Sequence, residues 1–329
     1  MVSSKTENMD TIGGLSEEAR SLLRCPVCRH ELCLSDQGMS CVACGKSFPV
    51  LQGIPVLINE NNSLFSIDDF VQERNTFFDL RPPGIAARVF KRLTPTLGTN
   101  VRGKANYLEF ARLLLQESET PRVLVLGGSI IGQGMESLAS DATIELVETD
   151  VSFGPRTKVI CDAHDIPWAD ETFDGVIAQA VLEHVLDPYR CVQEIHRVLK
   201  KDGIIYAEVP FMQQVHAPPY DFTRFSYLGF RWLFRRFEEI ELGICTGPGM
   251  ALAWAYRYFL SSFTPRFGRL IRLFAGITAW YLKYFDYFLS KKRTALDGAS
   301  GYYFLGKKGG VGLSGKDILE YYDGLRRVP

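Results

Sequence analysis

Short apolar runs alternate with stretches of helical periodicity through the middle of the chain. The apolar runs lie within 122–126, 143–150, 159–164, 173–185 and 203–210. Runs of this length separated by helices are typical of a parallel α/β sheet. Ligands of such sheets bind outside the carboxyl ends of the strands, where the Gly, Asp and His residues of this region lie. The pattern therefore predicts an enzyme or a ligand-binding protein.

Two helices are expected to border these strands. Residues 105–118 place apolar side chains at helical spacing, and Asp187-Pro188 has the composition of an N-cap followed by a first helical turn. The second helix should end near Gly203, after two lysines.

Two further apolar stretches, 236–242 and 301–308, are expected to form the last strands of the sheet. About sixty residues join them, far more than an ordinary loop contains. We therefore expect a helical insertion over 246–300. Two interpretations of it remain open: an amphipathic cap that contacts a membrane surface, or a helical pair that packs on the core or forms a dimer interface.

The composition and charge of the chain give limited information about the kind of partner and the compartment of the protein. The 329 residues are 46% hydrophobic and carry a net charge of −1, so the overall charge gives no reason to expect nucleic acid as a partner. The segment 249–293 differs, with eight Lys and Arg against one acid, Asp286, and thirteen aromatic residues. The polar first twenty residues and the absence of an eighteen-residue apolar stretch predict a cytoplasmic protein. It could lie peripherally on the inner face of the membrane through 249–293.

Two CxxC pairs near the start of the chain predict a metal site. Cys25 and Cys28 are separated from Cys41 and Cys44 by twelve residues, a spacing suited to four thiolates around one tetrahedral Zn²⁺. Four protein ligands leave no open position, so the zinc would be structural. Four reduced cysteines without a metal are the alternative. The segment 25–58, with its CPVC, CVAC and FPVLQGIPVL motifs, resembles the small zinc-ribbon activator protein of tRNA and release-factor methyltransferases, here fused to an α/β domain.

Residues at the strand ends suggest a nucleotide-type cofactor. Gly127 and Gly128 follow the first strand of the α/β region, and such glycines let the backbone approach a ligand. Acids end the next strand at Glu148 and Asp150, at the distance along the chain expected for a ribose contact. Asp162 ends the third strand, where it could reach an adenine amino group.

The region 105–245, above all DAHDIPWADETFDGVIAQAVLEHV, resembles class I S-adenosylmethionine-dependent methyltransferases, in particular the ubiquinone and menaquinone biosynthesis subgroup. The resemblance implies a Rossmann-like sheet of seven strands. It also implies a role in cofactor binding for Gly127, Gly128, Gly132, Asp150, Asp162, Ala163, Gln179 and Ala180. The turn GGSIIGQG is longer than the family's, with Val125 where an acid is usual. For this reason we prefer Asp150 to Glu148 as the ribose ligand.

Candidate catalytic residues lie in the loops beside the expected methyl group. His216 is the first candidate for a general base, since histidine titrates near neutrality; a loop histidine bonded to the backbone is the alternative. His184 and Asp221 are further candidates, although Asp221 could instead pair with Arg224, three residues on.

The expected activity is O-methylation of a sugar or lipid-linked acceptor. It is based on the segment HAPPYDFTRFSYLGF, which resembles bacterial methyltransferases of cell-surface glycan assembly. Alternatives are a non-catalytic activator of another methyltransferase and a tRNA or protein methyltransferase. The expected organisation is a zinc-ribbon module (20–60), a connector (61–104) broken at Pro82-Pro83-Gly84, a methyltransferase domain (105–310) and a tail (311–329).

Overall fold

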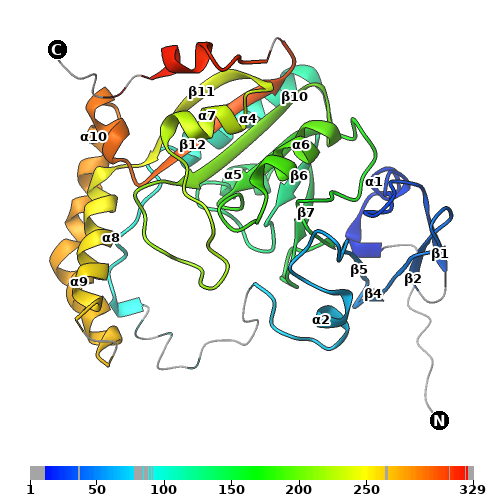
Figure 1. Cartoon of the computed structure of the whole chain (residues 1–329), viewed down its shortest axis with the longest axis horizontal. Helices are drawn as coiled ribbons and strands as arrows, with labels where there is room; N and C mark the ends of the chain where they lie inside the picture. Colours follow the sequence, from blue (N-terminus) through cyan, green and yellow to red (C-terminus); the bar gives the residue numbers. More distant parts are fainter. Residues whose placement is uncertain are drawn as a thin grey trace.

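A nine-stranded sheet runs through the middle of the molecule, with helices on both faces (Figure 1). The computed structural model describes residues 12–35, 38–77, 84, 88, 90, 92–263, 266–310, 312–322 and 324. The break predicted at Pro82-Pro83 lies outside these residues, as do parts of the connector and of the tail.

Seven strands form the α/β part of the sheet, as the sequence predicts. They are β6 (Arg122–Leu126), β7 (Glu145–Asp150), β8 (Val159–Cys161), β9 (Phe173–Gln179), β10 (Leu199–Pro210), β11 (Phe237–Thr246) and β12 (Gly301–Lys308). Their order is β8-β7-β6-β9-β10-β12-β11. Strand β12 lies antiparallel between β10 and β11, whereas the other pairs are parallel. The predicted Rossmann-like class is confirmed.

Side chains alternate between two hydrophobic cores along these strands. Helix α4 (Gly103–Glu117) and α5 (Glu136–Ala139) cover one face, where Phe110 packs with Val123 and Ile177. Helix α6 (Pro188–Val198) and α7 (Tyr227–Leu233) cover the other, where Ile195 packs with Leu124. Asp187 caps α6 by accepting the N–H of Arg190 at 3.0 Å. Strands buried on both faces account for the nearly continuous apolar runs.

The N-terminal part extends the same sheet. Strands β1 (Leu32–Ser35), β2 (Gly38–Cys41) and β3 (Ser47–Phe48) make a small antiparallel sheet of their own. In contrast, β5 (Ile54–Leu57) pairs in parallel with β8, and β4 (Val50–Leu51) forms the edge beyond it. The cysteine-bearing segment is therefore joined to the α/β domain by main-chain hydrogen bonds.

Trp168, in the α/β domain, packs at the junction between this domain and the N-terminal part. Its side chain is fully buried, and its indole N–H donates to the carbonyl of Ala19 at 3.0 Å, close to the short helix α1 (Glu17–Ser21). Cys25, Cys41 and Phe48 belong to the same hydrophobic core as Trp168. The two parts share one core and should therefore unfold together.

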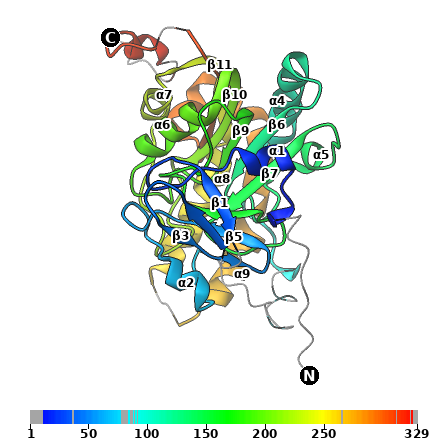
Figure 2. The same ribbon diagram turned by 90° about the vertical axis from the view of Figure 1, so that its right-hand side faces the viewer.

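The insertion between β11 and β12 is helical, as predicted. It contains α8 (Pro248–Ser261), α9 (Gly268–Ala279), η2 (Trp280–Phe285), α10 (Asp286–Leu289) and η3 (Arg293–Gly298). These helices stand at the opposite end of the sheet from the N-terminal module (Figures 1 and 2). Asp286 joins them: it is fully buried and accepts the N–H groups of Gly249 and Met250 at 2.7 and 2.9 Å. No helix in the described part of the chain has the length and apolar character needed to cross a membrane.

The two ends of the chain add short elements. Helix α2 (Ile67–Val71) follows β5 and begins with a capping box formed by Ser66 and Asp69. A 3-10 turn, η1 (Ile12–Gly14), precedes α1, and another, η4 (Asp317–Tyr321), packs near α7.

Candidate functional site

Two adjoining pockets open at the carboxyl ends of the parallel strands. The first lies over β7 and β8, and the second lies over β6, β9 and β10. Phe77, Leu126, Gly127, Ala180 and His184 line both pockets, so the two pockets are neighbours. This is the position at which sheets of this topology bind ligands.

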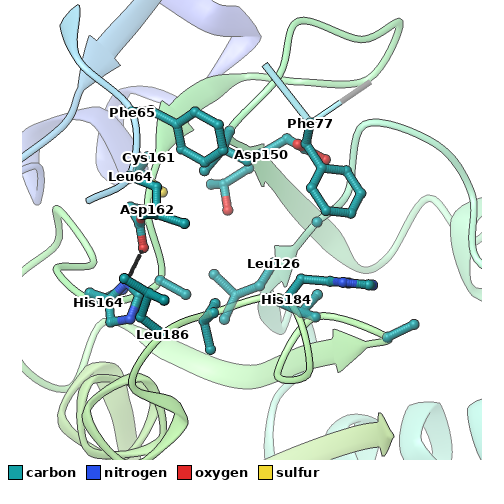
Figure 3. A pocket seen from close by; sticks show the side chains of 17 residues that line it. Leu64, Phe65, Phe77, Leu126, Asp150, Cys161, Asp162, His164, His184 and Leu186 are labelled. Atoms are coloured by element: carbon teal, nitrogen blue, oxygen red, sulfur yellow. Dashed lines mark hydrogen bonds and ion pairs between the residues drawn. The ribbon is translucent and has the colours of Figure 1, made fainter. Parts of the chain in front are cut away.

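Asp150 presents its carboxylate to the first pocket (Figure 3). It is 5% exposed, and it accepts the backbone N–H of Ser129 at 3.2 Å. Burial raises the pKa of this carboxyl, so a ligand that donates hydrogen bonds to it would relieve an unfavourable desolvation. Glu148, the other candidate for the ribose contact, lines neither pocket and pairs with Arg156 and with Lys158, whose Nζ lies 3.2 Å away.

Asp162 faces the same pocket and is held by three donors. The N–H and Nδ1 of His164 lie 3.0 and 2.6 Å from one carboxylate oxygen, and Ser63 Oγ lies 2.6 Å from the other. Burial opposes ionisation of Asp162, but the hydrogen bonds from His164 and Ser63 outweigh it and hold the pKa below its usual value. His164 Nε2 accepts the N–H of Asp187 at 3.0 Å, which assigns the Nδ1–H tautomer. His164 also lines the pocket, although it was not among the predicted site residues.

Apolar side chains from the N-terminal part close the first pocket. Leu64, Phe65 and Phe77 line this pocket together with Asp150 and Asp162 (Figure 3). Nothing in the local sequence pattern of 64–77 signals this role, because it depends on the pairing of β5 with β8.

The glycine turn is only partly as expected. Gly127 lines both pockets with φ +66°, and a Cβ there would lie 2.8 Å from Val181 Cγ2, so glycine is required. Gly132 lines the second pocket beside Gln179. Gly128 lines neither pocket: a Cβ on it would point at Glu148 and Val125. That Gly128 lies along the cofactor through its backbone stays a prediction.

A polar network lines the second pocket. Gln179 donates to Glu208 at 2.9 Å and accepts from the Tyr107 hydroxyl at 3.0 Å. Asn100 donates to the same Glu208 carboxylate at 2.8 Å. Burial raises the pKa of Glu208, although these hydrogen bonds partly oppose it. Sequence reasoning missed Glu208 and Asn100; the acid at the end of the strand 203–210 was the one available signal.

The backbone is strained beside this network. Ala180, predicted to line the methionine end of the cofactor, has φ +54° and lines both pockets. Ala163, predicted to frame the adenine, lines the first pocket only. A non-glycine residue in the left-handed region is uncommon and gathers at functional sites.

The predicted catalytic residues divide into two groups. His184 and His216 line the second pocket, with ring centroids 4.8 Å apart. Asp221 lines neither pocket; it pairs with Arg224 and accepts the N–H of His216 at 2.9 Å. Burial tends to raise the pKa of Asp221, but Arg224 and the other donors hold it low. The ion pair between Asp221 and Arg224 is confirmed, and a catalytic role for Asp221 stays a prediction.

Sequence reasoning overlooked the acid between these histidines. Glu183 is fully buried, lines the second pocket and has an oxygen 3.6 Å from His184 Nε2 and 3.5 Å from His216 Nε2. Its position in the chain, next to His184 at the end of the β9 segment, was the signal that could have found it.

The four predicted metal cysteines converge. The Cys25 and Cys44 sulfurs lie 3.7 Å apart and those of Cys28 and Cys41 3.3 Å apart, and all four lie within 4.8 Å of one another. A tetrahedral Zn²⁺ with bonds of about 2.3 Å needs sulfurs roughly 3.8 Å apart. The separations are far too long for disulfides, so the residues fit a structural zinc ion.

Comparison with known proteins supports one part of this picture directly. Residues 126–207, from the end of β6 to the middle of β10, match the family described as "Methyltransferase domain". The match covers about a quarter of the chain, and it supports a methyl-transferring enzyme. Most residues that line the first pocket lie within this matched segment.

Among curated proteins, the arginine-hydroxylase NDUFAF5 of Rattus norvegicus mitochondria is 34% identical over 67 residues, which are 20% of this chain and 19% of that protein. The mouse protein of the same name matches over the same length. The chain thus spans about a fifth of the length of these relatives. Their name describes a hydroxylase, so the shared segment does not by itself fix the reaction.

Solved structures resemble the methyltransferase domain only distantly. Phosphoethanolamine N-methyltransferase 2 of Haemonchus contortus, in complex with S-adenosylmethionine, is 17% identical and covers 62% of this chain and 53% of its own, with a TM-score of 0.39. A chain from the Haloferax volcanii complex of the Trm112 methyltransferase activator with a methyltransferase is also 17% identical, covers 68% and 96%, and has a TM-score of 0.38. At these TM-scores, neither structure gives information about the substrate of this chain.

Proposed function

We propose that this protein transfers a methyl group from S-adenosylmethionine to a hydroxyl of a sugar or lipid-linked acceptor. One observation carries the proposal: the two neighbouring pockets differ in chemistry. The first offers two carboxylates between apolar walls, which suits an adenosine. The second offers imidazoles and amides, which suit a polar acceptor. A cofactor that crosses from one pocket to the other would bring its sulfonium methyl to the acceptor.

The cofactor roles follow from this placement. Asp150 accepts the ribose hydroxyls, while Asp162 and Ala163 border the adenine. Gln179 and Ala180 border the methionine end, where Glu208 can accept hydrogen bonds from the cofactor's ammonium group. Phe65 and Phe77 exclude water from the adenosine. Transfer itself needs mainly alignment and exclusion of water, and an acceptor hydroxyl also needs to lose its proton. The group formed by Glu183, His184 and His216 lies on the acceptor side for that purpose.

The helical insertion supports the lipid-linked acceptor and a peripheral position at the membrane. Its outer surface exposes large apolar side chains, with Phe263 73%, Phe288 62% and Phe259 61% exposed. The same segment carries eight Lys and Arg against one acid. Exposed aromatic side chains combined with cations are typical of helices that lie in the interface of an anionic bilayer.

The cysteine module holds a structural zinc ion in this proposal. Because it shares a core and main-chain pairing with its own methyltransferase domain, it stabilises the first pocket from within the same chain. This arrangement favours an enzyme over an activator of a separate methyltransferase.

Isothermal titration of the zinc-loaded protein with S-adenosylmethionine and S-adenosylhomocysteine tests the cofactor. We expect one site per chain, and an absence of binding at millimolar ligand would refute the proposal. Transfer of labelled methyl groups to lipid-linked glycans, compared with transfer to tRNA and protein fractions, tests the acceptor class. Label in tRNA or protein alone would refute the glycan assignment and leave methyl transfer intact.

A further inference from the structure

Three side chains with metal-binding atoms converge at the acceptor side of the second pocket. Glu183 and His184 follow β9, and His216 comes from the loop after β10. One ligand atom from each lies within 4.8 Å of the others, and all three residues line the pocket. Glu183 Oε1 is the common point, 3.6 Å from His184 Nε2 and 3.5 Å from His216 Nε2.

The Glu183 carboxylate is fully buried and unsatisfied. Within the part of the chain that the structure describes, neither of its oxygens has a hydrogen-bond partner. Both imidazole nitrogens lie beyond ordinary hydrogen-bonding distance. A buried charge without a partner is strongly unfavourable, so such groups are normally paired or coordinate a metal.

The orientation of the His184 ring also favours a cation beside the Glu183 carboxylate. Its Nδ1 faces the backbone carbonyl of Tyr220, a group that can only accept, so Nδ1 carries the proton. The Nε2 lone pair is then directed towards the Glu183 oxygen. Two electron-rich atoms face each other, and a positive centre between them would turn this repulsion into attraction.

His216 also directs its Nε2 towards the same Glu183 oxygen. Metal-bound histidines commonly direct their second nitrogen to a carbonyl or a carboxylate. For His184 this group is the carbonyl of Tyr220. His216 Nδ1 lies 3.5 Å from the Asp221 carboxylate and has no hydrogen-bond partner among the described residues.

We infer that Glu183, His184 and His216 bind one divalent transition-metal ion at the acceptor end of the second pocket. Two ligand atoms about 2.1 Å from one ion lie roughly 3.4 Å apart at tetrahedral angles, close to both observed separations. Three protein ligands leave a coordination position open, as in catalytic rather than structural sites. Because the residues line the pocket, the open position faces the acceptor.

The role of the ion rests on the proposed methyl transfer, whereas its binding does not. An acceptor hydroxyl on the open position is more acidic than a free one, and its proton leaves to water in the pocket. The oxygen lone pair then forms the C–O bond as the methyl C–S bond breaks, with its electron pair remaining on sulfur. The products are the methyl ether and S-adenosylhomocysteine. The imidazoles act as ligands and do not serve as the base.

Titration with Mn²⁺ of protein that holds one equivalent of Zn²⁺ per chain, enough for the four thiolates alone, followed by the loss of free Mn²⁺ electron paramagnetic resonance signal, tests the site. Mn²⁺ prefers nitrogen and oxygen ligands over the four thiolates. We expect one Mn²⁺ per chain, and binding at least 100-fold weaker in Glu183→Gln and in His216→Gln. His196→Gln, on α6 away from both pockets, is the matched control and should bind normally. No binding by the unaltered protein at millimolar Mn²⁺, or equal binding by all variants, would overturn the inference.

A second measurement, the NMR spectrum of the histidine ring protons, uses only the unaltered protein. Bound Mn²⁺ should broaden the ring-proton resonances of His184 and His216 in the unaltered protein and leave those of His196 sharp; equal broadening of all three would count against the site. Titration with S-adenosylhomocysteine separates the two proposals. If the protein binds S-adenosylhomocysteine but does not bind Mn²⁺, the metal site alone is overturned. If it binds Mn²⁺ but does not bind S-adenosylhomocysteine, the metal site is retained and the proposed function is overturned.

Discussion

Replacing Asp150 by Asn tests the assignment of the ribose carboxylate. The two side chains are nearly equal in size, and the Asn oxygen can still accept the N–H of Ser129, which Asp150 accepts at 3.2 Å. What is lost is the charge and the acceptor capacity for two ribose hydroxyls. Hydrogen bonds to a charged group contribute about 1.5–3 kcal/mol each. The loss of two at the lower end, about 3 kcal/mol, corresponds to a Kd for S-adenosylhomocysteine roughly 100-fold higher.

The stability of the free protein should respond differently. Burial raises the pKa of Asp150, so its ionised carboxylate destabilises the folded protein in the absence of a ligand. Asp150→Asn should therefore not lower the Tm. Glu148→Gln is the control on the same strand. It should lower the Tm, because it removes the partner of Arg156 and Lys158, but keep the Kd. Isothermal titration and thermal unfolding measure both quantities. A normal Kd in Asp150→Asn together with a raised Kd in Glu148→Gln would show that Glu148 is the ribose ligand.

The remaining predictions concern the zinc site, one histidine and the helical insertion. Cys25→Ser should remove one zinc per chain, measured by mass spectrometry, and lower the Tm of the whole protein, because Cys25 shares its core with Trp168; a separate early transition would contradict this. Burial lowers the pKa of His196 to about 4, so the unfolded state binds a proton first as pH falls from about 6.5. The stability of the protein should therefore fall between pH 6.5 and 4, less steeply in His196→Gln, and an unchanged Tm–pH slope would refute the assignment. Phe259→Ser combined with Phe263→Ser should weaken binding to phosphatidylglycerol vesicles at least tenfold; equal binding by both proteins would argue against membrane contact through this surface.

The sequence alone determined the elements and their class. The strands between 122 and 210, the helix after Asp187 and the helical character of 246–300 follow from periodicity and capping, which are local properties. The cysteine spacing likewise predicted a cluster that the fold brings together. Strand ends are also local, which is why Asp150, Asp162 and Gln179 could be selected as candidates and lie at the pockets.

Tertiary structure decided which side chains share a space. The pairing of β5 with β8 brings Phe65 and Phe77 over the first pocket, and strand pairing across such a distance leaves no local signature. Asp221 looked suitable in sequence, but it pairs with Arg224 and lines neither pocket. Glu183 lies beside His216, which is thirty-three residues later in the chain. The two residues meet because the loops that carry them lie at the same edge of the sheet. The sequence supplied the chemistry at each strand end, and only the fold could set the distances on which that chemistry depends.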